Sequence, residues 1–165
     1  MRHEIERNLR SLNQRYRNAP NTKEALYASK LAIIELGGWI ETSMDDIVER
    51  CATRHLREQK NREFCKQKII QTTWGFEYDK HFKNMLIRLI GLIRLERIEK
   101  HLDTGVHSAF LASLGAMKIA RNLEAHTYLK GTTRSVLAPS VTLSHYSNIE
   151  KGLAQIDRAV RLSRY

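Results

Sequence analysis

Apolar side chains recur along most of this chain at intervals of three, four and seven residues, the spacing of one face of an α-helix. The clearest run has its apolar positions at Leu26, Ile33, Gly37, Ile40, Met44, Ile47 and Cys51. The strict alternation of half-buried strands is absent, and only two prolines and eight glycines interrupt the chain. The sequence therefore predicts an all-α fold.

Breaks in this pattern divide the first half of the chain. We expect a first helix over residues 4–16, which must end before Pro20 because the residue ahead of a proline avoids helical geometry. Asn21 or Thr22 has the side chain of a helix N-cap, so a second helix is expected to start there and to run to about residue 57.

Three more helices are expected in the second half. The third covers residues 79–102, with an apolar stripe at Phe82, Leu86, Leu89 and Ile93 and with Leu92 and Ile98 beside it. The fourth follows residues 103–105 and carries apolar Phe110, Leu111, Leu114, Met117 and Ala120. The last begins near Ser144 or Ser147; its inward positions are Ile149, Leu153, Ile156 and Val160, and its outward ones are Lys151, Arg158, Arg161 and Arg164. No repeat or linker divides the chain, so residues 1–165 are predicted to form a single bundle of about five helices.

The cysteine content and the absence of long apolar runs bear on the compartment. Two cysteines, Cys51 and Cys65, are too few for a secreted disulfide scaffold. The first ten residues carry charge throughout, and arginines interrupt the later apolar runs well short of a membrane span. We expect a cytoplasmic protein that does not contact a membrane.

Charge adds a class of partner. The chain has 28 Lys and Arg against 18 Asp and Glu, a formal net charge of +10, which favours partners that carry phosphate groups. Arg50, Arg54 and Arg57 are expected to share one helical face and to form a basic track for the RNA backbone. The other candidates for RNA binding are Lys118, Lys130 and Arg134. The alternative for the first three is a solvated helix end, where basic residues are favoured by the helix dipole.

Three aromatic residues crowd around Gly75. Trp74, Phe76 and Tyr78 lie in a predicted loop, where exposed rings could stack on unpaired bases. The alternative is that they pack into the bundle core or against a second copy of the chain.

The residues with the most specific chemical pattern are Arg-Asn-Leu-Glu-Ala-His at 121–126. This segment resembles the R-x4-H motif of HEPN domains, in which the second position is often asparagine, as Asn122 is here. Residues 31–41, which are apolar, contain Gly37 and Gly38 and end in Glu41, are similar to the second helix of several HEPN families.

The resemblance implies a helical, metal-independent endoribonuclease that needs no cofactor. It implies that Arg121 and His126 are catalytic, with Asn122 as a positioning group. It further implies a twofold homodimer that cuts RNA to 2',3'-cyclic phosphate and 5'-hydroxyl ends. The usual settings of such enzymes are toxin–antitoxin pairs and defence against phage, so a cognate antitoxin or another defence-system protein is an expected partner.

The chemistry of these side chains agrees with RNA cleavage. An imidazole exchanges protons near neutral pH, and a guanidinium stays charged and matches phosphate oxygens. Residues five apart on a helix are separated by about 140° around its axis, so Arg121 and His126 of one straight helix do not lie side by side. Either the helix ends or bends within the motif, or a second protomer completes the site.

Other interpretations of the same residues stay open. Glu41, Glu124 and Tyr128 are candidates for a supporting shell around the site, although Arg121 could pair with Glu41 or Glu124 in a purely structural role. Tyr128 extends the motif to the form that is nucleotidylated in some HEPN toxins. The main alternative function is a catalytically silent HEPN module that binds RNA or a partner protein. Cys51 and His55 are half of a metal site at most, and no metal is expected.

Overall fold

The computed structural model describes residues 2–125 and 135–162, and these are entirely helical apart from turns and connections. They form seven α-helices and two π-helical segments: α1 (Arg2–Arg17), α2 (Thr22–His55), α3 (Gln59–Phe64), η1 (Cys65–Ile70), η2 (Tyr78–Phe82), α4 (Lys83–Ile90), α5 (Leu92–Glu99), α6 (Thr104–Ala125) and α7 (Pro139–Leu162). The all-α prediction is confirmed. The expected number of about five helices is wrong.

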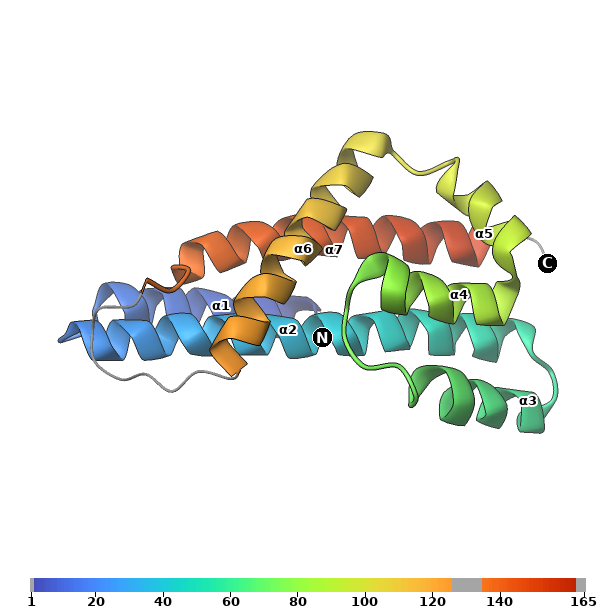
Figure 1. The fold of residues 1–165 in the computed structure, drawn as a ribbon, viewed down its shortest axis with the longest axis horizontal. Coiled ribbons are helices and arrows are strands. Elements are labelled where there is room, and N and C mark those ends of the chain that lie inside the picture. Colours follow the sequence, from blue (N-terminus) through green and yellow to red (C-terminus); the bar gives the residue numbers. More distant parts are fainter. Residues whose placement is uncertain (1, 126–134, 163–165) are drawn as a thin grey trace.

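The spine of the molecule is α2, whose 34 residues span roughly 50 Å at 1.5 Å per residue. Near its beginning α2 packs against α1, and α7 lies along both helices (Figure 1). The other end of α2 carries α3, η1 and α4, while α6 crosses α7 and α2 obliquely. Segments far apart in the sequence therefore meet on α2.

The core follows the predicted apolar stripes. Every position of the α2 stripe is buried, and so are the four inward residues predicted for α7. Phe82 and Phe110 are fully buried. The helical period alone identified these faces correctly.

The predicted third helix is interrupted, which is a correction. Gly91 has φ of +84°, a backbone conformation that favours glycine, and it separates α4 from α5. The turn takes the end of the expected stripe out of the core. As a result, Leu92 is 57% exposed and Ile93 is 71% exposed. Leu86 stays buried on α4.

Two helix boundaries also differ from expectation. Helix α7 starts at Pro139, several residues before the predicted serines, and proline suits the first turn of a helix because its missing N–H would be unpaired there anyway. Helix α2 starts as expected, with the Asn21 side chain accepting a hydrogen bond from the Glu24 N–H at 2.9 Å. It ends at His55, so Arg57 lies beyond it.

The three aromatic residues around Gly75 have different environments. Phe76 and Tyr78 are buried in the core, and the Tyr78 hydroxyl donates a hydrogen bond to Glu99 Oε1 at 2.8 Å. Trp74 is 81% exposed. Packing in the core is confirmed for the first two, and Trp74 is presented to solvent.

Helices α6 and α7 approach each other closely at Gly152, which is a testable feature. A Cβ at this position would lie 2.4 Å from Phe110 Cγ, and that ring is fully buried. We expect Gly152→Ala to lower the free energy of unfolding by about 1–3 kcal/mol or more through overpacking. Urea denaturation measures the change.

Gly38→Ala is the matched control for this substitution. Gly38 also lies within a helix, but a Cβ there would meet nothing within 4 Å. The loss of backbone entropy is smaller for alanine, so Gly38→Ala should stabilise the protein by about 0.5–1 kcal/mol. Equal effects of the two substitutions would contradict the packing described for Gly152.

The described residues contain no helix that is both long and apolar enough to cross a bilayer.

Candidate functional site

Arg121 is held by an ion pair with Glu41. Its Nη2 donates a hydrogen bond to Glu41 Oε1 at 3.1 Å, although the two residues are 80 positions apart in the sequence. The side chains are 35% and 32% exposed, so the pair lies at the surface and keeps contact with solvent. The structure thus brings together the arginine of the 121–126 motif and the acid that ends the 31–41 segment.

Gly37 explains how α6 approaches α2 at this point. A Cβ on Gly37 would lie 3.1 Å from Arg121 Cγ and 3.6 Å from Phe76 Cε1. The missing side chain therefore makes room for the aliphatic part of Arg121. Glu41 lies one turn further along α2, where it meets the guanidinium.

A second ion pair lies one turn before Arg121 on α6. Lys118 Nζ donates a hydrogen bond to Glu77 Oε1 at 2.7 Å. This hydrogen bond is the main reason why the pKa of Glu77 is lowered. Lys118, a predicted RNA-binding residue, is 43% exposed; Glu77 neutralises it in part, but it remains accessible.

His81 joins this cluster from η2. Its Nδ1 accepts a hydrogen bond from the Glu77 backbone N–H at 3.0 Å, so Nε2 carries the proton when the ring is neutral. The ring packs against Gly75, where a Cβ would lie 2.8 Å from His81 Cε1. Burial lowers the pKa of His81, against the opposing charges of Glu77 and Glu41. This histidine is therefore neutral and has a defined tautomer at neutral pH.

The remaining residues of the 121–126 motif have separate environments. Asn122 is exposed, and its Oδ1 accepts a hydrogen bond from Arg121 Nη1 at 3.3 Å. Glu124 is only 2% exposed and faces the core, whereas Arg121 pairs with Glu41. Four predicted site residues, His126, Tyr128, Lys130 and Arg134, lie outside the described residues.

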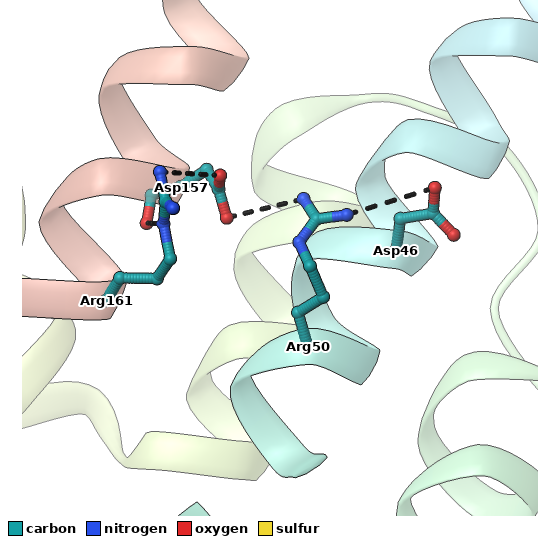
Figure 2. A network of polar contacts seen from close by, with 4 residues as sticks. All are labelled: Asp46, Arg50, Asp157 and Arg161. Carbon is teal, nitrogen blue, oxygen red and sulfur yellow. Dashed lines mark hydrogen bonds and ion pairs between the residues drawn. The ribbon is translucent and has the colours of Figure 1, made fainter. Parts of the chain in front are cut away.

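The predicted basic track on α2 is divided. Arg50 Nη2 contacts Asp157 Oδ1 at 3.3 Å, and Asp157 also pairs with Arg161 at 3.2 Å (Figure 2). Arg50 thus links α2 to α7. Arg54 and Arg57 are exposed, but the prediction that all three share one helical face is wrong because α2 ends before Arg57.

Helix α6 also carries an exposed apolar face, which we define by Leu111, Gly115, Ile119 and Leu123. These residues are spaced four apart, and Ile119 is 69% exposed and Leu123 53% exposed. A Cβ at Gly115 would meet nothing within 4 Å. Asn122 follows Ile119 by three residues, which places it about 60° from Ile119 around the helix axis, so this apolar face borders the motif.

Asp45, one turn beyond Glu41, supports a prediction about stability. Burial, and then the charges of Glu41, Asp46 and Glu49, raise the pKa of Asp45 from 3.8 to about 6. Its ionisation therefore opposes folding: the penalty is absent below about pH 4, grows between pH 4 and 6, and is complete above that. Because the side chain is partly exposed, we take the penalty as about 1–2 kcal/mol.

Asp45→Asn should accordingly raise the free energy of unfolding by about 1–2 kcal/mol at pH 7.5 and change it little at pH 4. Urea denaturation at both pH values measures this difference. Asp79→Asn is the control, since that side chain is 86% exposed and its replacement should have little effect at either pH. An equal gain for Asp45→Asn at both values would contradict the assigned cause.

The sequence analysis did not predict that Glu77 and His81 belong to the cluster of charged and polar side chains around Lys118 and Arg121. The local signal was weak, because a glutamate and a histidine four apart are common on polar helix faces. Gly75 was visible as a chain break, but its contact with the His81 ring depends on how the segment between η1 and η2 folds back. Within the described residues, no group of three or more His, Cys, Asp or Glu side chains is arranged to hold a metal ion.

No protein-family model, curated protein or solved structure matches this chain. Any functional assignment must therefore come from the residues and their geometry.

Proposed function

We propose that this chain is a metal-independent endoribonuclease of the HEPN type that works as a twofold homodimer. Arg121 and His126 are its catalytic residues and Asn122 positions the scissile phosphate. The observation that carries the proposal is the surface ion pair of Arg121 with Glu41. It holds a guanidinium in a fixed, solvent-accessible position five residues before the histidine of the motif.

The proposed reaction is attack of the ribose 2'-hydroxyl on the adjacent phosphorus. A neutral imidazole takes the hydroxyl proton, the new P–O2' bond forms, and the P–O5' bond breaks. A protonated imidazole donates a proton to the leaving 5'-oxygen. The products are a 2',3'-cyclic phosphate and a 5'-hydroxyl, and Arg121 stabilises the extra negative charge of the phosphorane.

The dimer supplies two imidazoles to one site. Each chain has a single motif histidine, whereas the reaction uses one as base and another as acid. The exposed apolar face of α6 borders Asn122, and a twofold axis beside it would bring two copies of the motif together. Such a face is unusual at the surface of a monomer unless a partner covers it.

Nearby residues fit an RNA substrate. Lys118 adds a second cation near Arg121. His81 adds a neutral imidazole whose pKa is raised by the charge of Glu41 and lowered by the charge of Lys118. The net charge of +10 favours a polyanion. Arg54, Arg57, Lys130 and Arg134 remain proposed contacts to the RNA backbone.

Trp74 is a proposed stacking platform for an unpaired base. It is 81% exposed and precedes Gly75, the residue that packs on His81. Trp74→Ala should weaken RNA binding by about 1–3 kcal/mol, because each base–aromatic stack contributes that much. Titration of fluorescently labelled single-stranded RNA measures the change, and exposed Phe64→Ala on α3 is the control.

The test of the function is cleavage of structured RNAs, including transfer RNA, by the purified full chain in EDTA. We expect cleavage with cyclic phosphate and 5'-hydroxyl ends, and slower cleavage as salt concentration rises. We further propose a cytoplasmic toxin or anti-phage effector that is held in check by a cognate antitoxin or another defence-system protein.

The Arg121–Glu41 ion pair also favours one alternative, a catalytically silent module that binds RNA or a partner protein. In that case the pair would only join α6 to α2. Salt-sensitive RNA binding without any cleavage across the panel would favour this alternative over the ribonuclease.

A further inference from the structure

A cavity lies between α5, the turn that follows it, and the last turns of α7. Its volume is about 570 Å³, within the range of pockets that hold small molecules. It shares no residue with the cluster around Arg121, so a ligand bound in it is independent of the proposed ribonuclease.

The walls of this cavity are mainly apolar. Ile98 and Leu102 come from α5 and the following turn and are buried, while Ala159 and Leu162 come from α7. Leu162 is 71% exposed and lies at the edge of the cavity. These walls suit an aliphatic or aromatic group.

The charged groups around the cavity are mostly basic. Arg97, His101 and Arg158 line it, and neither arginine forms an ion pair within residues 2–125 and 135–162. By contrast, Arg161 on the same helix pairs with Asp157 at 3.2 Å. Among the described residues that line the cavity, Asp103 is the one with a carboxylate; it accepts a hydrogen bond from the Val106 N–H at 2.8 Å and so caps α6.

Gln155 adds an unusual donor to this wall. Its Nε2 is buried and has no hydrogen-bond partner in the described part of the chain, and Gln155 lines the cavity. Buried amide donors in native proteins almost always have an acceptor. Because Nε2 has almost no accessible surface, the Gln155 side chain must turn toward the cavity before an oxygen atom of a bound molecule can accept its hydrogen bond.

We propose that this cavity binds an amphipathic monocarboxylate, such as a medium-chain fatty acid or an aryl carboxylic acid. The apolar body lies against Leu102, Ala159 and Leu162. The carboxylate accepts a hydrogen bond from Gln155 and pairs with Arg158 and Arg97. A carboxylate matches this set because its two oxygens accept hydrogen bonds from an amide and from a guanidinium together.

The experiment is calorimetric titration of the full chain with octanoate and with 2-naphthoate, each compared with its neutral amide. The acids should bind at least about tenfold more tightly than the amides, because charge-assisted hydrogen bonds to the arginines are lost in the amides. Equal affinity of acid and amide, or no heat from either acid at millimolar concentration, overturns the proposal.

Three variants locate the site. Arg158→Gln should weaken binding of either acid about tenfold, whereas Lys151→Gln, on an exposed position of α7 outside the cavity, should not. Gln155→Leu should raise the melting temperature of the free protein, because a buried unpaired donor is removed, and should weaken acid binding. Ala159→Trp should fill the cavity and block binding while the circular dichroism spectrum stays helical. Equal weakening by Lys151→Gln and Arg158→Gln would show general attraction to a basic surface and overturn the assignment.

Discussion

Replacing Arg121 with alanine should reduce the rate of the proposed RNA cleavage by a factor of about 100 or more, since it removes the cation that we propose stabilises the phosphorane. The loss should appear in kcat, because that charge develops in the transition state. His126→Ala should reduce the rate by about 10²–10⁴ through loss of proton transfer. Both are measured on the same transfer RNA substrate in EDTA.

The control for the arginine is Arg10→Ala. Arg10 is also a surface arginine in an ion pair, with Glu6 at 2.6 Å, but it lies on α1. This variant should cleave like the wild type. Thermal melts followed by circular dichroism check that each variant is folded. Arg121→Ala also releases Glu41 from its ion pair, but an exposed pair of this kind contributes only about 0–1 kcal/mol to stability, so the melting temperature should change little.

Glu41→Gln separates catalysis from positioning. It keeps the size of the side chain but loses its charge, so Arg121 is less firmly held while its guanidinium remains. We expect a smaller loss of rate than for Arg121→Ala.

If Arg121→Ala and His126→Ala cleave as fast as the wild type, the catalytic assignment of the 121–126 motif is wrong.

Ile119→Asp should convert the proposed dimer to a monomer and abolish the proposed RNA cleavage with it. Ile119 is 69% exposed at the centre of the apolar face of α6. In a twofold dimer the two copies of a residue near the axis lie close together, so the substitution would place two carboxylates within an apolar interface, which is strongly unfavourable. Light scattering coupled to size exclusion measures the mass, and the transfer RNA assay measures the rate.

Ile93→Asp is the matched control for the dimer. Ile93 is 71% exposed on α5, so the same change of side chain is made at a similar exposure on another helix. This variant should remain dimeric and active. A wild type that is monomeric and active at micromolar concentration would contradict the composite site, and so would an active Ile119→Asp monomer.

Several parts of the candidate site were predictable from the sequence because their signals are local. The Arg121 motif lies within six residues, and Gly37, Gly38 and Glu41 stand together in one helical segment. The contact between these two segments was not predictable. It depends on α6 crossing α2 where Gly37 has no side chain, and nothing in either segment specifies the crossing point.

The same distinction holds for the third predicted helix. The stripe from Phe82 to Ile93 follows the helical period without an interruption, so the pattern favours one continuous helix. Gly91 alone indicated a break, and an isolated glycine within a helical pattern is often tolerated. Its positive φ accompanies the turn after which α5 contacts α7, and a contact between such distant segments is not visible in the local pattern.

The sequence by itself determined the all-α class, the buried faces of α2 and α7, and the basic charge of the surface. Each of these follows from side-chain type and a spacing of three or four residues, which are properties of neighbouring positions. Only the tertiary structure decided that Arg121 pairs with Glu41, that Gly75 and Glu77 hold His81 beside Lys118, and that Ile119 stays uncovered. These arrangements depend on how whole helices pack, because the free energy of packing is shared among residues far apart in the chain.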